Sequence, residues 1–266
     1  MLVTRIRRTR ITIAAGLAIA TWHSSSALAT DDNWQFTIGA GVVNGPEYPG
    51  AADNKTKAVP LINATYGRYF IGGMPGTGVP FGVGANLYQD QQWRVGVAVG
   101  AGLGKAREES DDVRLRGLGD IDGTARGGMF ASYTGSWYGV RANVMTDIGG
   151  KDQGTLASFD LEGRYVPLKG LMLTAGPGLT WADNKYTDTF FGINAAQSAR
   201  SGLARYDAKG GINSVRFSVG ANYRLTPNWS LNARVTASEL RGDAAKSPIT
   251  ADKSQTTVGL FSAYRF

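Results

Sequence analysis

The sequence predicts an all-β protein: an antiparallel transmembrane β-barrel of twelve strands that follows a cleaved signal peptide. Three observations support this fold class. The chain opens on a basic and then apolar leader, apolar and polar residues alternate in many short segments, and the last segment ends on the aromatic residue Phe266. In that segment Val258, Leu260, Tyr264 and Phe266 share one face, which is typical of the final strand of a bacterial outer-membrane barrel.

The leader is expected to span 1–29, and the mature barrel 30–266 as one domain. Four arginines between positions 5 and 10 form the basic part, 11–20 are apolar but too few to span a bilayer, and 27–29 read Ala-Leu-Ala, a small-residue cleavage site. The Arg7–Arg8 pair also suggests the twin-arginine route. We expect the general secretory route to the bacterial outer membrane, because a barrel must be exported unfolded.

Composition argues against several classes of function. The chain carries 28 basic and 21 acidic residues, a net charge of +7 that falls to about +3 without the four leader arginines, so it gives no indication of nucleic-acid binding. There is no cysteine, and the single histidine, His23, lies in the leader. The mature chain therefore lacks disulfides, Cys or His metal ligands and any His-dependent nucleophile. We predict a protein that is not an enzyme and has no catalytic residue, metal or cofactor.

Alternation with a period of two defines the strands. In 92–104, Trp93, Val95 and Val97 lie on one face, and Arg94 with several glycines lies on the other. An apolar exterior and a polar lumen explain charged residues inside strands better than a soluble sandwich does, and no apolar run reaches the length of a transmembrane helix. The twelve expected strands are 33–43, 58–66, 68–73, 79–88, 92–104, 122–134, 136–148, 154–165, 170–182, 213–224, 229–240 and 255–266. Pro60 and Gly67 make 58–73 the least regular part.

The connections sort by length. Those after even-numbered strands are short turns, whereas 44–57, 105–121, 183–212 and 241–254 are long; 74–78 and 149–153 are the short exceptions. Short periplasmic turns and longer outer loops are typical of these barrels and place both termini in the periplasm. Nine aromatic residues then fall on the lipid-facing side at the periplasmic rim, where an aromatic girdle is expected. They are Trp34, Trp93, Tyr133, Tyr138, Tyr165, Tyr223, Trp229, Tyr264 and Phe266.

Charged residues inside the barrel are the first functional candidates. Those expected to face the lumen are Arg94, Arg141, Asp160, Glu162, Arg164, Arg216, Arg224 and Arg234. They either select small anionic solutes in a narrow pore, or pair with one another or with a loop and fill a barrel that has no open path. A hydrolase built on Asp160 and Glu162 is disfavoured, because the arginines keep both carboxylates ionised.

Two outer loops carry further candidates. The acidic stretch 108–112, with Asp120 and Asp122, either binds a divalent cation, as surface lipopolysaccharide does, or is a solvated loop; the spacing of a calcium loop is absent. The loop 183–212 contains Phe190, Phe191 and Tyr206. Apolar residues seldom lie free in a loop, so we expect them to fold onto the barrel rim, with a lid in the mouth or a docked partner as alternatives.

The loops also carry a family resemblance. The segments are PEYPG at 46–50, LRGLGD at 115–120, WADNKY at 181–186, FFG at 190–192, SGL at 201–203 before Tyr206 and the glycines 210–211, and LRGDAAKSPI at 240–249. In this order, over the whole mature length, they resemble the MltA-interacting protein / OmpV family. The resemblance implies an outer-membrane barrel and no known catalytic residues. It also implies a scaffold that joins a murein transglycosylase to a murein synthase in peptidoglycan synthesis, or a role in osmotic response, adhesion or solute passage.

Two functions follow as expectations. The first is a non-enzymatic scaffold for the murein machinery, with outer-membrane lipid, lipopolysaccharide and the two murein enzymes as partners. The second is a narrow, porin-like channel for small solutes.

Overall fold

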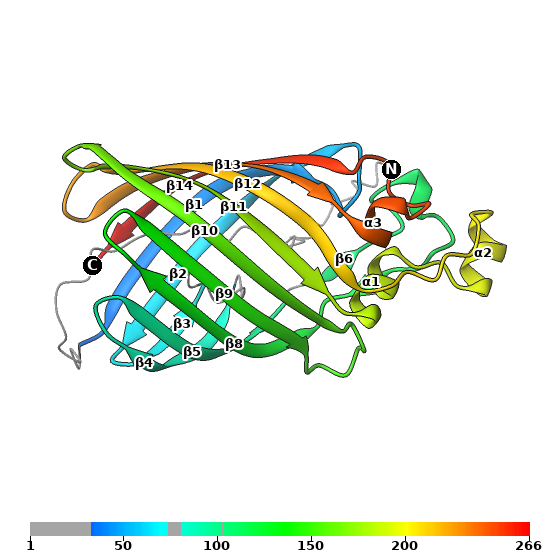
Figure 1. The fold of residues 1–266 in the computed structure, drawn as a ribbon, viewed down its shortest axis with the longest axis horizontal. Helices are drawn as coiled ribbons and strands as arrows, with labels where there is room; N and C mark the ends of the chain where they lie inside the picture. Colours follow the sequence, from blue (N-terminus) through cyan, green and yellow to red (C-terminus); the bar gives the residue numbers. More distant parts are fainter. Residues whose placement is uncertain (1–32, 74–80, 103) are drawn as a thin grey trace, which may run out of the picture.

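The computed structural model describes residues 33–73, 81–102 and 104–266, which form a closed β-barrel with a group of loops at one end (Figure 1). The expected signal peptide, 1–29, lies outside the described residues. The strands of the barrel are β1 (Gln35–Pro46), β2 (Asn54–Tyr66), β3 (Tyr69–Gly72), β4 (Gly82–Gln89), β5 (Trp93–Ala101), β8 (Ala125–Thr134), β9 (Tyr138–Asp147), β10 (Thr155–Leu168), β11 (Leu171–Ala182), β12 (Gly211–Arg224), β13 (Trp229–Leu240) and β14 (Ser254–Arg265).

Neighbours in this list are antiparallel neighbours in space, and β14 closes the ring against β1, from Thr37 opposite Arg265 to Asn44 opposite Val258. The backbone N–H of Phe266 donates to the carbonyl of Phe36 at 3.0 Å beside this seam. Closure gives each strand a neighbour on both sides, which is how a sheet satisfies its backbone inside lipid. The prediction of a twelve-stranded antiparallel barrel is confirmed. None of the helices in the described part of the chain is long and apolar enough to cross a membrane.

The outer and inner faces of the strands also agree with the predicted alternation. On β5 the side chains of Trp93, Val97 and Val99 are exposed on the outside, whereas Gly96 and Ala98 are buried inside. The other long strands alternate in the same way, because successive side chains of a strand point to opposite faces.

The lumen is not wholly polar, which corrects the expectation. Phe70, Ala98, Phe130 and Met145 form a buried cluster on the inner wall. A ring of twelve strands encloses more space than its backbone fills, and inward glycines leave room for these rings. A Cβ on Gly96 would lie 2.5 Å from Cζ of Phe130, and one on Gly84 would lie 2.2 Å from Cζ of Phe70.

The irregular region 58–73 contains both predicted strands with shifted bounds. β2 begins at Asn54 and β3 keeps only Tyr69–Gly72. β3 pairs with β2 from Asn63 to Tyr66, and Pro60 lies opposite Ala40 of β1.

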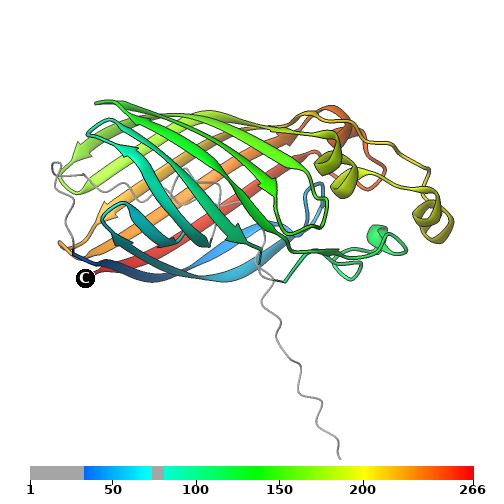
Figure 2. The same cartoon turned by 90° about the horizontal axis from the view of Figure 1, so that it is seen from below.

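Short elements occupy the long connections, where the sequence predicted loops. They are the small sheet β6 (Lys105–Arg107) and β7 (Ile121–Asp122), the 3₁₀ turn Val113–Leu115, and the helices α1 (Asn184–Phe191), α2 (Ala195–Ser201) and α3 (Gly242–Lys246). The expected strand 122–134 therefore enters the barrel only at Ala125. Figure 2 shows all of these elements beyond the same end of the barrel, opposite the C-terminus.

Candidate functional site in the lumen and its lid

Four connections meet over one mouth of the barrel. They are 47–53, 105–122, 183–210 and 241–253, which we call the lid. Each contributes at least one buried side chain to a common cluster, which includes Tyr48, Leu115, Ile193 and Ile249. In the ring order, the connections that contribute Leu115 and Ile249 start on opposite sides of the barrel. Loops from opposite sides can share a buried cluster only by reaching over the mouth, so the lid spans it.

A second buried cluster ties the lid to the rim. Phe190 and Phe191 of α1 pack with Ile121, Leu240 and Ala244. The backbone carbonyls of the two phenylalanines accept hydrogen bonds from Arg107 Nη1 at 2.9 Å and Ser247 Oγ at 2.6 Å. The apolar residues of 183–212 thus pack between other outer loops and the top of β13. This agrees with folding onto the rim and adds that they help to span the mouth.

Arg107 is expected to hold the lid together. It is 2 % exposed and joins β6 to α1. Arg107→Ala removes a buried hydrogen bond from a charged donor, which contributes about 1.5–3 kcal/mol. Amide hydrogen exchange in 105–122 and 183–210 should become roughly tenfold faster or more, while exchange in β10–β13 stays unchanged. Arg116→Ala, an exposed arginine of the same loop, is the control. Equal effects of the two changes would contradict the role of Arg107.

Tyr48 is expected to make the lid sensitive to alkaline pH. Its hydroxyl lies 3.2 Å from the carbonyl of Ile249 and 3.4 Å from Asp112 Oδ2. Burial, reinforced by the Asp112 carboxylate, raises the pKa of Tyr48 to about 12. A pKa above the ordinary value of about 10 favours the protonated, folded form. The contribution of Tyr48 is therefore complete below about pH 10 and is lost as the pH rises toward 12.

Limited proteolysis of the lid across this pH range tests the expectation. Cleavage should increase between about pH 10 and 12 in the wild-type protein. In Tyr48→Phe this increase should be much smaller, because no hydroxyl is left to ionise. Tyr69→Phe, at the opposite end of the barrel, should behave as wild type.

The acidic stretch turns its carboxylates toward its own loop. Asp111 Oδ2 accepts from the Glu108 N–H at 2.8 Å, and Asp120 Oδ1 accepts from the Glu109 N–H at 2.8 Å. Lys105 Nζ forms ion pairs with Asp120 and Glu108, and its hydrogen bond to Asp120 holds the pKa of that carboxyl below its usual range. Within the described ranges no group of three or more acidic or histidine side chains is arranged to hold a metal ion. These acids order the loop.

Capping residues define the ends of two lid helices, α1 and α2. Asp183 Oδ1 accepts from the Tyr186 N–H at 2.8 Å and caps α1. Asn194 and Gln197 form a reciprocal capping box at α2, and Gly202 ends that helix in the left-handed conformation. An Asn followed three residues later by Gln is a known helix start. This pattern at 194–197 is the local signal in the sequence for α2.

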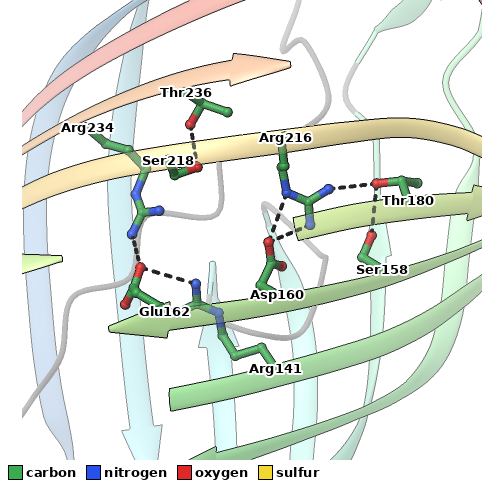
Figure 3. Close-up of polar contacts among 9 residues, drawn as sticks. All are labelled: Arg141, Ser158, Asp160, Glu162, Thr180, Arg216, Ser218, Arg234 and Thr236. Atoms are coloured by element: carbon green, nitrogen blue, oxygen red, sulfur yellow. Dashed lines mark hydrogen bonds and ion pairs between the residues drawn. The ribbon is translucent and has the colours of Figure 1, made fainter. Parts of the chain in front are cut away.

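Two groups of ion pairs cross the inner wall of the lumen (Figure 3). In the first, Glu162 of β10 accepts from Arg234 Nη2 of β13 at 2.8 Å and lies 3.5 Å from Arg141 Nη2 of β9. Glu162 is 4 % exposed, and β13 is separated from β10 by two strands. One carboxylate therefore links three strands across the curved wall.

In the second group, Arg216 of β12 holds Asp160 of β10. The Arg216 Nε and Nη2 atoms lie 2.9 and 2.6 Å from Asp160 Oδ1, and Nη1 donates to Thr180 Oγ1 at 2.8 Å. Ser218 Oγ of the same strand lies 2.9 Å from Thr236 Oγ1 of β13. Charge-assisted hydrogen bonds of this kind fix side-chain positions.

The structure brings five of the eight predicted lumen residues into these two groups, and it places the other three on the same inner face. Arg94, Arg141, Asp160 and Arg216 lie in one cross-strand row. Arg164 follows Glu162 two residues along β10, and Arg224 ends β12 at the short-turn rim. The alternation also places three further cations on the inner face, which were not predicted: Lys57, Arg126 and Arg265. Basic residues thus outnumber acids on the described inner wall.

The nine predicted girdle residues all lie near the short-turn end. Several are in ring contact: Trp93 with Tyr133 at 5.0 Å, Trp229 with Tyr264 at 5.1 Å, and Tyr264 with Phe266 at 4.9 Å between centroids. Three further aromatic residues, which were not predicted, are in ring contact with members of this group: Phe36 and Tyr66 with Trp34, and Trp137 with Tyr138. Their role at a membrane interface stays a prediction.

A closed antiparallel barrel with an apolar exterior and a charged interior defines the class: this is an outer-membrane β-barrel protein. A family model described as MltA-interacting protein MipA matches residues 38–266, and the chain belongs to this family. The MltA-interacting protein of Escherichia coli K12 is 27 % identical over 261 residues, covering 96 % of this chain and 98 % of that protein. YiaT of the same organism is 25 % identical over 234 residues, covering 87 % and 91 %.

A solved structure shares the fold. It is the COG4313 outer membrane channel from Pseudomonas putida F1, with a TM-score of 0.51, 14 % sequence identity, and coverage of 90 % of this chain and 97 % of that one. At this identity the likeness concerns the arrangement of the strands alone.

Proposed function

We propose that the protein is a non-enzymatic interaction protein of the outer membrane, a scaffold that brings a murein transglycosylase and a murein synthase together. Membership of the family and the name of the E. coli relative support a transglycosylase partner. The structural observation that carries the proposal is the packed lid, together with the ion pairs that line the inner wall of the lumen. Both favour a barrel that works through its surface over a wide, freely conducting pore.

The surface that the barrel offers to a periplasmic partner is small. On the short-turn side the connections are only a few residues long, and they expose Arg68, Lys169 and Trp137. The scaffold therefore binds its partners at this rim, with its basic side chains facing acidic groups of the partner.

Pull-down from envelope extracts with the detergent-solubilised full-length protein tests the proposal. A murein transglycosylase and a murein synthase should be recovered with the wild type. The double change Arg68→Ala and Lys169→Ala at the rim should reduce their recovery several-fold. Lys185→Ala, an exposed lysine at the lid end, should not. Recovery of neither enzyme would contradict the scaffold.

A narrow channel for small anions is the second candidate, favoured by the excess of basic side chains on the inner wall. Steady conductance in planar bilayers that falls when Arg94 or Arg141 is changed to Gln would support it. Lys253→Gln, an exposed cation outside the lumen, is the control. A barrel without conductance would reject the channel and leave the scaffold standing.

A further inference from the structure

A small cavity lies at the edge of the lid, where α1, the start of β12 and α3 meet. Its volume is about 90 Å³, enough for several water molecules or one small anionic group. Its lining includes Thr187, Lys209, Gly211, Asn213, Arg241 and Asp243. None of these residues belongs to the lumen ion pairs or to the expected aromatic girdle.

A β-bulge places Asn213 beside the cavity. Trp181 pairs with Ile212 and Thr180 pairs with Ser214, so Asn213 is the extra residue between them. Bulges often redirect a side chain next to a functional site. Asn213 is 9 % exposed, and its amide Nδ2 has no hydrogen-bond partner within the described part of the chain. A buried donor without a partner is costly, so Asn213 Nδ2 is available to an acceptor that enters the cavity, either a water or a ligand oxygen.

Two cations flank the same cavity. Lys209 Nζ pairs with Asp207 at 2.7 Å, and Arg241 Nη2 pairs with Glu239 at 2.8 Å. Lys209, Arg241 and Asp207 are at least half exposed, and ion pairs of this kind contribute little, so either cation can turn toward a ligand. The carboxylate in the lining, Asp243, accepts the Lys209 N–H at 2.9 Å through Oδ2. The lining side chains therefore carry more positive than negative charge.

The position of the cavity indicates where a ligand comes from. Trp181 and Ile212 are large, exposed side chains on the outer face of the barrel, and Ile212 lines the cavity. The row of exposed apolar side chains thus ends where the cavity begins, and the expected orientation of the barrel, with the long loops outside the cell, places this end at the outer leaflet. In an outer membrane this leaflet carries phosphorylated lipopolysaccharide.

We propose that this cavity binds a phosphate monoester group, with the Asn213 amide, Lys209 and Arg241 as hydrogen-bond donors to its oxygens. The location favours a phosphate carried by a lipid headgroup. Free phosphate has the same chemistry and is distinguished by experiment.

The test uses the full-length protein refolded in a detergent free of lipopolysaccharide. Binding of lipid A, of chemically dephosphorylated lipid A and of inorganic phosphate is followed by tryptophan fluorescence and native mass spectrometry. The double change Lys209→Gln and Arg241→Gln should weaken lipid A binding roughly tenfold or more. Asn213→Ala should weaken it less. The matched control, Lys151→Gln with Lys185→Gln, removes two exposed lysines at the same end of the barrel but outside the cavity.

Tight binding of lipid A, weak binding of its dephosphorylated form, and competition by phosphate only at millimolar concentration would identify the headgroup as the ligand. Equally tight binding of inorganic phosphate would support the same site with free phosphate as its ligand. The proposal is overturned if dephosphorylated lipid A binds as well as lipid A. It is also overturned if the double variant and its control lose the same affinity while circular dichroism shows both folded.

Discussion

Replacing Glu162 by glutamine is expected to lower the free energy of unfolding by about 3 kcal/mol. The carboxylate is almost fully buried and is held by Arg234 and Arg141, whose side chains are only 15 % and 12 % exposed. Removing the negative charge leaves two guanidinium groups close together with little solvent to screen them. The loss of a buried partner costs more than the loss of the attraction itself, because the remaining charges were already desolvated.

Glu239 provides a matched control. Its carboxylate also holds two cations, Arg241 at 2.8 Å and Lys253 at 3.5 Å, but it lies at the lid end and is far more exposed than Glu162. Glu239→Gln is expected to cost less than about 1 kcal/mol. Urea unfolding of both variants in lipid vesicles, followed by tryptophan fluorescence, measures the difference. Similar losses in the two variants would mean that the lumen screens charge as well as the surface does.

The barrel itself could be predicted because its physical rule is local. In a strand between lipid and a lumen, apolar and polar side chains alternate. The outer and inner faces can therefore be assigned from the sequence of the strand itself, as for Trp93 and Arg94 in β5. Turn lengths then order the strands without any long-range information. The rule was weaker around Pro60, where β2 begins at Asn54, four residues before the predicted start at 58.

The partners inside the lumen could not be predicted in the same way. The alternation places Glu162 and Arg234 on the inner face, but their contact depends on how far the wall curves between β10 and β13. Periodicity also ignores volume, so it could not indicate that the rings of Phe130 and Phe70 would pack against Gly96 and Gly84 on the opposite strands. A lid over the mouth was one of the alternatives for 183–212, but its helices were not predicted, because they have five to eight residues and depend on packing between loops distant in sequence.

Gly96→Ala is expected to lower the free energy of unfolding by about 1–3 kcal/mol, although alanine usually stabilises a strand relative to glycine. A Cβ at this position would lie 2.3 Å from the carbonyl oxygen of Ala85 and 2.5 Å from Cζ of Phe130. Neither neighbour yields easily, because one is backbone and the other is packed in the cluster with Phe70 and Met145. The added methyl group therefore forces the ring or the strand to move.

Gly163→Ala is the control, since the nearest atom to its Cβ would be the carbonyl oxygen of Ala175 at an ordinary 3.5 Å. That change should be neutral or slightly stabilising, because it reduces the freedom of the unfolded chain. The same urea titration separates the two. If Gly96→Ala were as stable as Gly163→Ala, the inner wall would be loose enough to accept side chains, and the rings would not be seated on glycine. If Gly96→Ala is destabilised and adding Phe130→Leu restores the lost stability, the clash with the ring is the cause. A glycine opposite an aromatic residue on the inner face would then predict this packing in other barrels of the family.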